Sequence, residues 1–506
     1  MSFRISSFSV EGNSLKTPEV NLSKNMGRSV DNYFTVVIGN NGTGKSRFIS
    51  NLIEAFRDIG EEKRREIIDY SLKYRINEVD FYAERKRGKK NRDIKSNEGL
   101  WPHGTLNIPS KVIAITTSIS DKFSLDSYLR RKQYDNTNDN NKDFYTYLGP
   151  RRGVQGASNR ALMDRAITTF ISNIGDYDYN ESYRHIFDYL KYEPVMKLAY
   201  EVRRPKNIYN LNGHLSDGDL KEYLRDYSLR RGGIRERSIH KALEEKSGHY
   251  WKQLAETYNY IRHNTENSRK RLEFSFMVNF SEENEVREKI ALGSHQAQLY
   301  SSLEELRRFE LVKGPEIRLY KKDGGEFEFS DASSGEASIL STLIALIPSI
   351  ENNSLLIIDE PEISLHPSWQ SRYIELIDTI LSNKKGCHIV IATHSHFLIS
   401  DLPLDRSHIV HFKAGKHSSV IVDYINGETH GLSAEDILLN VFDMPSTRNY
   451  YLSKDISEAL ELVADGETNS DRFTYLIASF KRYLPNLKDV DPLKDIIETL
   501  LSMGGK

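Results

Sequence analysis

Eight consecutive residues near the start of the chain have the types and the spacing needed to hold phosphate groups. The segment GNNGTGKS follows an apolar run that predicts a strand and precedes an amphipathic run that predicts a helix. Its glycines let successive backbone N–H groups face a phosphate, its lysine supplies a mobile positive charge, and its serine hydroxyl can bind Mg²⁺. The residues expected to bind ATP and Mg²⁺ are Gly39, Asn40, Asn41, Gly42, Thr43, Gly44, Lys45 and Ser46.

A pair of carboxylates ends a second apolar run, LLIIDEPEISLHP, which begins at Leu355. Two acids at the end of a buried strand are costly unless a metal or hydrogen-bond donors satisfy them. Beside a bound nucleotide, Asp359 would hold the Mg²⁺ ion together with Ser46, and Glu360 would orient or deprotonate the attacking water. The alternative is a strand that simply ends in solvent, which the phosphate-binding segment makes the weaker interpretation.

A histidine follows the next predicted strand, IVIATHSHFL. We expect His394, at the tip of this strand, to sense the γ-phosphate of the nucleotide. His396 could take this role instead, but strand alternation and the Thr-His-Ser setting favour His394. Zinc binding is not expected, because no third ligand stands at a fixed spacing from the two histidines.

The start of a further predicted helix, in FSDASSGEASIL, carries several small residues that could bind an anion. A helix cap alone needs one such residue, and Asp331, Ser333 or Ser334 would each serve. This surplus raises the question of whether the helix N-terminus also binds a phosphate.

The order and intervals of these four segments resemble those of ABC-type ATPases. The segment ASSGE, from Ala332 to Glu336, stands where that family has its signature, usually Leu-Ser-Gly-Gly-Gln. The resemblance implies that Ser333 and Gly335 contact the γ-phosphate of a nucleotide held by another subunit. It thus implies a homodimer or higher oligomer closed by a head-to-tail ATP sandwich. The departures from the signature are typical of the SMC/RecF-like branch, and they lie at Ala332, Ser334 and Glu336.

Other segments narrow the resemblance. EISLHP, after the acid pair, resembles RecF-, SMC- and OLD-like ATPases, and YLGPRRG and THSHFLIS are similar to the PtuA-type ATPases of Septu and retron anti-phage systems. That family works beside a separate HNH nuclease, and we see no HNH constellation or Toprim acid triad here. Two alternatives stay open, namely a RecF/SMC-like repair or chromosome-maintenance ATPase and a nucleotide-gated scaffold with slow hydrolysis. The family's glutamine loop is placed either at Gln155 or at Thr117–Ser118.

The expected fold is α/β, an ABC-type ATPase head with a mixed, largely parallel sheet, a helical insertion and a helical C-terminal extension. Periodicity changes along the chain set the expected boundaries. They are 1–152 for the N-terminal part of the head, 153–271 for the helical insertion, 272–431 for the C-terminal part of the head and 432–506 for the extension.

Composition excludes several classes of protein. The 506 residues carry a formal net charge of −2, so any contact with nucleic acid would have to come from local basic clusters, at 85–95 and 230–241. The alternative for each cluster is a solvated loop. The single cysteine, Cys387, excludes intrachain disulfides and is expected to be buried. No apolar run approaches the roughly 20 residues of a membrane span. We therefore expect a cytoplasmic protein without membrane contact.

Overall fold

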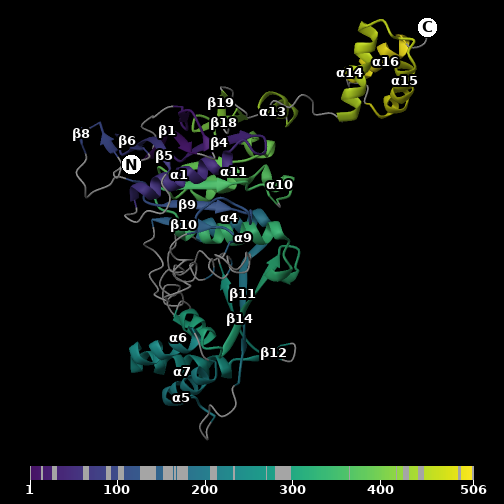
Figure 1. The fold of residues 1–506 in the computed structure, drawn as a ribbon. Coiled ribbons are helices and arrows are strands. Elements are labelled where there is room, and N and C mark those ends of the chain that lie inside the picture. Colours follow the sequence, from purple (N-terminus) through teal and green to yellow (C-terminus); the bar gives the residue numbers. More distant parts are fainter. Residues whose placement is uncertain are drawn as a thin grey trace. The chain divides into compact units, whose positions relative to one another are not determined.

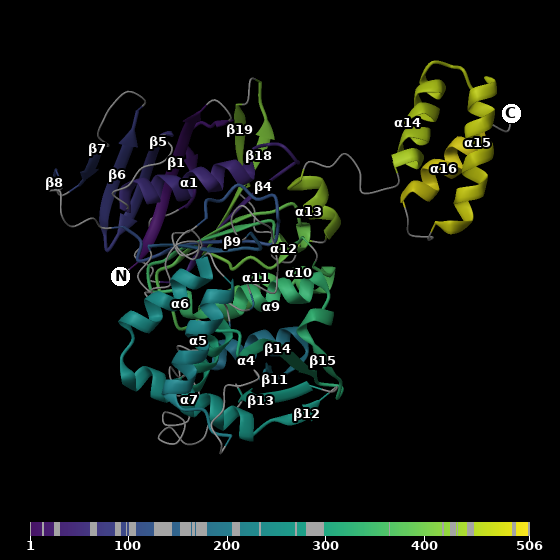
Figure 2. The ribbon, with the colours of Figure 1, turned by 60° about the horizontal axis from the view of Figure 1, so that its bottom comes forward.

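The computed structural model describes most of the chain (Figures 1 and 2). The described residues are 2–12, 15–24, 31–60, 68–86, 93–97, 99–100, 108–125, 144–151, 163, 167, 180–204, 213–231, 234–268, 271–279, 298–363, 365–416, 419–425, 432, 434–442, 450–487 and 492–503. The chain divides into two compact units, Met1–His430 and Gly431–Lys506.

A central sheet crosses the first unit. Its strands are β10 (Tyr145–Leu148), β9 (Val112–Thr116), β16 (Leu355–Asp359), β17 (His388–Ala392), β4 (Tyr33–Gly39), β18 (Ser407–Ala414) and β19 (Val420–Ile425), in that spatial order. All neighbours are parallel except β18 and β19. Every residue of β4, β9, β16 and β17 is buried, as expected for parallel strands covered on both faces. The predicted α/β class with a mixed sheet is confirmed.

A second, antiparallel sheet lies across helix α1 (Lys45–Gly60) from the central sheet (Figure 2). Its order is β2 (Leu15–Lys16), β1 (Phe3–Gly12), β5 (Asp69–Ile76), β6 (Val79–Arg85), β7 (Asp93–Ser96) and β8 (Gly99–Leu100), with β3 (Val20–Asn21) also paired to β1. Aromatic rings join these layers, because Phe3 packs on Phe56 and Phe8 packs on Phe48, which also contacts Phe412. The helix that begins at Lys45 is thus fixed from both sides.

A buried histidine ties the two sheets together. His388 Nδ1 accepts the Ile5 N–H at 3.0 Å, and Nε2 lies 2.8 Å from Thr35 Oγ1. The Thr35 hydroxyl in turn donates to the Leu22 carbonyl, so Nε2 carries the proton of a neutral ring. Burial, with the nearby Arg4 charge, lowers the pKa of His388 well below its ordinary value.

A third sheet occupies the middle of the chain. Its order is β12 (Glu266–Ser268), β13 (Arg271–Asn279), β11 (Tyr192–Val202), β14 (Val312–Lys321) and β15 (Glu326–Glu328). Helix α4 (Asn180–Leu190) precedes β11, and Figure 1 shows further helices gathered at the end of β11 and β14 away from the central sheet. These are α5 (Asp217–Arg231), α6 (Ile234–Glu245) and α7 (Gly248–His263).

The prediction of a helical insertion over 153–271 therefore needs correction at β11. This strand is paired on both sides, to β13 and to β14, and its partners come from residues 271–279 and 312–321. A strand stabilised by neighbours so far along the chain depends on tertiary pairing more than on local sequence preference. The helices expected in this range are present in α5, α6 and α7.

Shorter helices connect the strands of the central sheet. They are α9 (Ser334–Leu346), preceded by the 3₁₀ turn Phe329–Asp331 and followed by the 3₁₀ turn Ile347–Ser349, and α10 (Pro367–Gln370), α11 (Tyr373–Ile380) and α12 (His396–Ser400). Helix α9 is buried along almost its whole length, which explains its nearly continuous apolar sequence. Cys387 is buried just before β17, as predicted.

The second unit is helical. Helices α14 (Tyr450–Ala464), α15 (Asp471–Tyr483) and α16 (Pro492–Met503) share an apolar core, and the short helix α13 (Ala434–Asn440) comes before them in the chain. Ser470 caps α15 by accepting the Phe473 N–H. The core residues are Ile456, Ala459, Phe473, Leu476, Ile477, Phe480, Ile497 and Leu500. Among the described residues of the chain, none forms a helix long and apolar enough to cross a bilayer.

Candidate nucleotide-binding site

The candidate site lies where β4, β16 and β17 end. These strands are parallel neighbours, with Val37 paired to Ala392 and Ala392 paired to Asp359. Their carboxyl ends therefore meet at one edge of the sheet, where ligands of open α/β sheets usually bind. The phosphate-binding segment leaves β4 there, and the acid pair and His394 leave β16 and β17 at the same edge.

The phosphate-binding segment needs glycine for two different reasons. Gly39, Gly42 and Gly44 all have positive φ angles, of 143°, 82° and 97°. At Gly39 a Cβ atom would also lie 2.2 Å from the Phe412 carbonyl oxygen, whereas at Gly42 it would meet nothing within 4 Å. The first glycine is thus required by close packing and by conformation, and the second by conformation alone.

Lys45 is buried and turned back on its own loop. Its Nζ donates to the Gly39 carbonyl at 2.8 Å and to the Asn40 carbonyl at 3.2 Å, and it lies 3.1 Å from His394 Nε2. Burial lowers the pKa of Lys45 to about 8, although the charges of Glu360, Glu362 and Asp359 oppose the shift. The Lys45 ammonium group, which would bind a triphosphate, is thus held by its own loop and by His394.

Ser46 and Asp359 form a hydroxyl–carboxylate pair suited to a divalent cation. Ser46 Oγ donates to Asp359 Oδ1 at 3.0 Å. Burial raises the pKa of Asp359 to about 7, and the charges of Glu360, Asp121 and Glu362 act in the same direction. Mg²⁺ usually binds through one or two protein oxygens plus phosphates and waters, so these two residues fit it. Among the described residues, no group of three or more His, Cys, Asp or Glu side chains could hold a metal by itself.

Glu360 and His394 meet at the tip of the two strands. Glu360 adopts a left-handed conformation, with φ of 47°, and its N–H donates to the Ala392 carbonyl at 2.9 Å. This conformation turns the carboxylate toward His394, whose Nε2 lies 3.1 Å from Glu360 Oε1. The hydrogen bond with His394 lowers the pKa of Glu360, so its carboxylate is charged at neutral pH. The structure brings His394 to Lys45 and Glu360, whereas His396 begins α12 and packs on Phe397.

A third carboxyl group belongs to the site. Glu362 Oε1 accepts the His394 backbone N–H at 2.6 Å, while Oε2 is buried without a hydrogen-bond partner among the described residues. Burial raises the pKa of Glu362. Its segment, EISLHP, carried part of the family resemblance, but no role at the site was predicted for Glu362. A third acid within four residues of a strand end is the signal that could have identified it.

The signature segment forms a capped helix start. Ser333 Oγ accepts the Glu336 N–H at 3.2 Å, and Glu336 Oε2 accepts the Ser333 N–H at 2.9 Å, so the two residues form a capping box. The Tyr192 hydroxyl donates to Glu336 Oε1 at 2.7 Å. Ser333 is thus the N-cap that the sequence left open among three residues. Contact of Ser333 and Gly335 with a nucleotide of another subunit stays a prediction.

The two candidates for the glutamine loop fare differently. Gln155 lies outside the described residues. Thr117 follows β9 directly, and its hydroxyl donates to the Glu360 carbonyl at 3.2 Å. Nearby, Asp121 accepts hydrogen bonds from Tyr147 and Arg151, and its charge contributes to the raised pKa of Asp359. The end of β9 therefore lies beside the acid pair.

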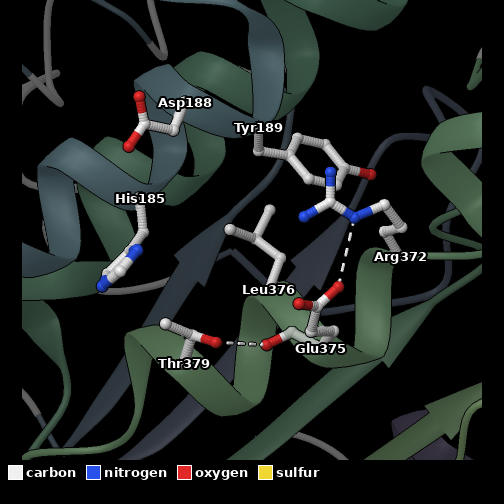
Figure 3. Close-up of a pocket in the computed structure, with 7 residues that line it drawn as sticks. All are labelled: His185, Asp188, Tyr189, Arg372, Glu375, Leu376 and Thr379. Atoms are coloured by element: carbon white, nitrogen blue, oxygen red, sulfur yellow. Dashed lines mark hydrogen bonds and ion pairs between the residues drawn. The ribbon is translucent and has the colours of Figure 1, made fainter.

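A separate hollow of about 290 Å³ lies between α4 and α11 (Figure 3). Figure 3 shows Leu376 between the two helices, with Arg372 bound to Glu375. The Tyr189 hydroxyl donates to the Trp369 carbonyl. The residues that line the hollow are His185, Asp188, Tyr189, Arg372, Glu375, Leu376 and Thr379, and none of them belongs to the phosphate-binding segment.

The basic clusters are described only in part. Residues 87–92 of the first cluster and the side chains of 230–238 in the second lie outside the described residues. Nucleic-acid binding by these clusters stays a prediction.

The parallel strand ends bring the phosphate-binding segment, the acid pair and His394 together, the arrangement that the motifs predicted. A family model described as "AAA domain, putative AbiEii toxin, Type IV TA system" matches residues 197–400, which hold the acid pair and His394. This match and the likeness to PtuA confirm the resemblance that the motifs indicated.

Two curated proteins are similar to parts of the chain. It is 35% identical to Protein ea59 of Escherichia phage lambda over 115 residues, which are 21% of this chain and 20% of that protein. It is 26% identical to Septu protein PtuA of Bacillus thuringiensis over 216 residues, which are 39% of this chain and 52% of that protein. The chain thus spans about a fifth of the length of Protein ea59 and about half of the length of PtuA.

Similar solved structures include heads of SMC proteins. The SMC head domain from Thermotoga maritima matches with a TM-score of 0.34 and 11% identity, over 84% of this chain and 100% of that chain. The Smc head domain of Pyrococcus furiosus, with an extended coiled coil and bound to the C-terminal domain of ScpA, matches with a TM-score of 0.32 and 12% identity, over 84% and 96%.

The two glycines predict different costs of substitution. Gly42→Ala should lower the free energy of unfolding by about 1–2 kcal/mol, the cost of a left-handed non-glycine residue. Gly39→Ala should cost at least about 1–3 kcal/mol more, because the Cβ atom also overlaps Phe412. Thermal and urea unfolding of the full chain measures both. Equal costs would contradict the close packing at Gly39.

The shifted pKa values predict how nucleotide affinity depends on pH. Below about pH 7 Asp359 is protonated, so the Mg²⁺-dependent part of ATP affinity should rise about tenfold per pH unit toward pH 7. Above about pH 8 Lys45 loses its charge, and affinity should fall again. Titration with a fluorescent ATP analogue from pH 6 to 9, with Mg²⁺ and with EDTA, tests this. In EDTA the rise in affinity toward pH 7 should disappear. If this rise persists in EDTA, Asp359 is not its cause.

Glu362 is predicted to position His394 through its backbone N–H. Glu362→Gln keeps an acceptor oxygen and should retain most ATP turnover, whereas Glu362→Ala should lower kcat about ten- to a hundredfold with little change in KM. Steady-state ATPase assays on both variants, beside their unfolding temperatures, separate positioning from folding. Similar losses in both variants would show that the charge of Glu362, not the bond to His394, is what matters.

Proposed function

We propose that this chain binds and hydrolyses ATP as a subunit of an anti-phage defence complex, in which head-to-tail dimers control a separate nuclease of the HNH type. One observation carries the ATPase part of the proposal. Lys45, the Ser46–Asp359 pair and the Glu360–His394 pair converge at one sheet edge through contacts of 3.0–3.1 Å. The likeness to PtuA supports the defence role.

Each residue has a defined task in this proposal. Lys45 leaves the Gly39 carbonyl to bind the β- and γ-phosphates, while the N–H groups of the glycine loop surround the β-phosphate. Ser46 and Asp359 would hold Mg²⁺, which neutralises charge that develops on the phosphates. Glu360, charged at neutral pH, orients the attacking water and accepts its proton. His394 senses the γ-phosphate and contacts Glu360.

The second subunit completes the site in this proposal. Ser333 and Gly335 lie at the N-terminus of α9, where backbone N–H groups and the helix dipole favour an anion. Closing this end over the γ-phosphate of the partner's nucleotide would exclude water and add hydrogen-bond donors. Hydrolysis then releases the contact, so the dimer state would follow the nucleotide state.

Two substitutions should abolish turnover but differ in assembly. Removing a preorganised contact costs on the order of 10²–10³ in rate, so Ser333→Arg and Glu360→Gln should both be nearly inactive. With ATP and Mg²⁺, Glu360→Gln should accumulate as a closed dimer, whereas the bulk of Ser333→Arg should prevent closure. Analytical ultracentrifugation measures the difference. Ser333→Ala is the control for folding, because it removes the cap without adding bulk and should still close. Equal dimerisation of the Arg and Gln variants would refute the sandwich.

The defence role is tested by the partners that the closed form retains. Tagged Glu360→Gln protein, purified from its native host with ATP, should bring down an HNH protein, with or without a reverse transcriptase and its RNA–DNA product. Recovery of repair or replication proteins would instead support the RecF/SMC-like alternative. A turnover far below that of hydrolytic relatives, with an ATP-stabilised oligomer, would support the scaffold alternative.

A further inference from the structure

The outer face of the second sheet carries a row of three side chains that no part of the ATPase site uses. Lys73 of β5 pairs with Tyr82 of β6, and Tyr82 pairs with Lys95 of β7. Cross-strand partners point to the same face, so a tyrosine stands between two lysines on adjacent strands. Both lysines are exposed and Tyr82 is partly exposed. The neighbouring residues Tyr74 and Phe81 point the other way, into the core under α1.

This face is hollowed. A cavity of about 450 Å³ lies at the row, and it is lined by Lys73, Arg75, Asp80, Tyr82, Lys95 and Asn97 together with Ser6, Tyr74, Phe81 and Ser96 of the same sheet. Its position on the outer face separates it from the nucleotide site, which lies at the carboxyl ends of the central strands. A ligand here would therefore not compete with ATP.

The positively charged side chains that line the hollow differ in how readily they could bind a ligand. Lys95 forms no ion pair with any described residue. Lys73 pairs with Glu19 at 2.6 Å, but both side chains are about half exposed, and such a pair contributes little and is readily exchanged. Arg75 is held by both carboxylate oxygens of Asp80, at 2.6 and 2.8 Å, and so is less available. The available positive charge thus lies on the two lysines beside Tyr82.

We propose that this hollow binds single-stranded nucleic acid, with one base stacked on Tyr82 and the flanking phosphates on Lys73 and Lys95. Neighbouring strands lie about 4.8 Å apart, so the two lysine backbones stand about 10 Å apart, one on each side of the ring. Long lysine side chains can follow a backbone that passes over the ring. Stacking on an aromatic side chain requires an unpaired base, which excludes a continuous duplex. The shared chemistry does not distinguish DNA from RNA.

The test is fluorescence anisotropy with fluorescein-labelled dT20, U20 and a 20-base-pair DNA duplex, on the full chain at 50–200 mM salt. Tyr82→Ala should weaken binding of the single strands about 5- to 150-fold, the range that stacking on one aromatic side chain provides. Tyr82→Phe should bind as the unchanged protein does, which separates stacking from folding. Tyr475→Ala, at an exposed tyrosine of the second unit, is the control.

Substitutions of the two lysines and of Glu19 provide a second, independent test. Lys73→Ala with Lys95→Ala should reduce the slope of log affinity against log salt by about 1.4, or about 0.7 for each phosphate that the protein no longer neutralises. Glu19→Gln should tighten binding, since it frees Lys73. Lys16→Ala is the matched control, because Lys16 forms a similarly exposed ion pair with Glu11 in the same sheet but does not line the hollow.

Three outcomes would overturn the proposal. They are no binding of either single strand at tens of micromolar protein, single-strand binding that Tyr82→Ala leaves unchanged, and a preference for the duplex. Different affinities for dT20 and U20 would support the proposal and would show whether DNA or RNA is the preferred strand. Because none of these measurements uses ATP turnover, a failure here and a failure of the proposed ATPase would be seen separately.

Discussion

The arrangement of this protein depends on a balance of charge at one buried sheet edge. The charges of Asp359, Glu360 and Glu362 all act on Lys45, whose ammonium group is itself largely desolvated. Bringing three carboxyl groups together in a medium of low polarity is costly, and the pKa values record the cost, raised for Asp359 and Glu362 and lowered for Glu360 beside His394. In the proposed function, a triphosphate with its cation would change this balance. The site would thus respond to the arrival and loss of charge.

The scaffold around this edge is correspondingly rigid. Helix α1 is packed between two sheets, and the neutral ring of His388 joins strands of both. The candidate phosphate-binding loop is therefore anchored by β4 before it and by α1 after it. Preorganised donors of this kind do not have to be reoriented when a ligand binds.

The convergence of the candidate nucleotide-binding residues could be predicted from the sequence largely because its signals are local. Gly39 to Ser46, Asp359, Glu360 and His394 each follow an apolar strand, and parallel topology then brings strand ends together. Features set by distant pairing could not be read in this way. Strand β11 gains both of its partners from later parts of the chain, and the row of Lys73, Tyr82 and Lys95 exists only because of the register of three strands. Glu362 was missed because its partner is a backbone N–H rather than a side chain.

Strand β11 has a consequence for communication within the first unit. Its first residue, Tyr192, holds Glu336 of the capping box, and the strand then runs to Val202, beyond which the chain continues into the helices of the insertion. A partner that moved β11 by displacing those helices would act on the start of α9 through Tyr192, and any event at α9 would then change the affinity for that partner by the same factor. In the proposed function, the start of α9 is therefore the place at which an external binding event and the nucleotide cycle would share a single coupling free energy.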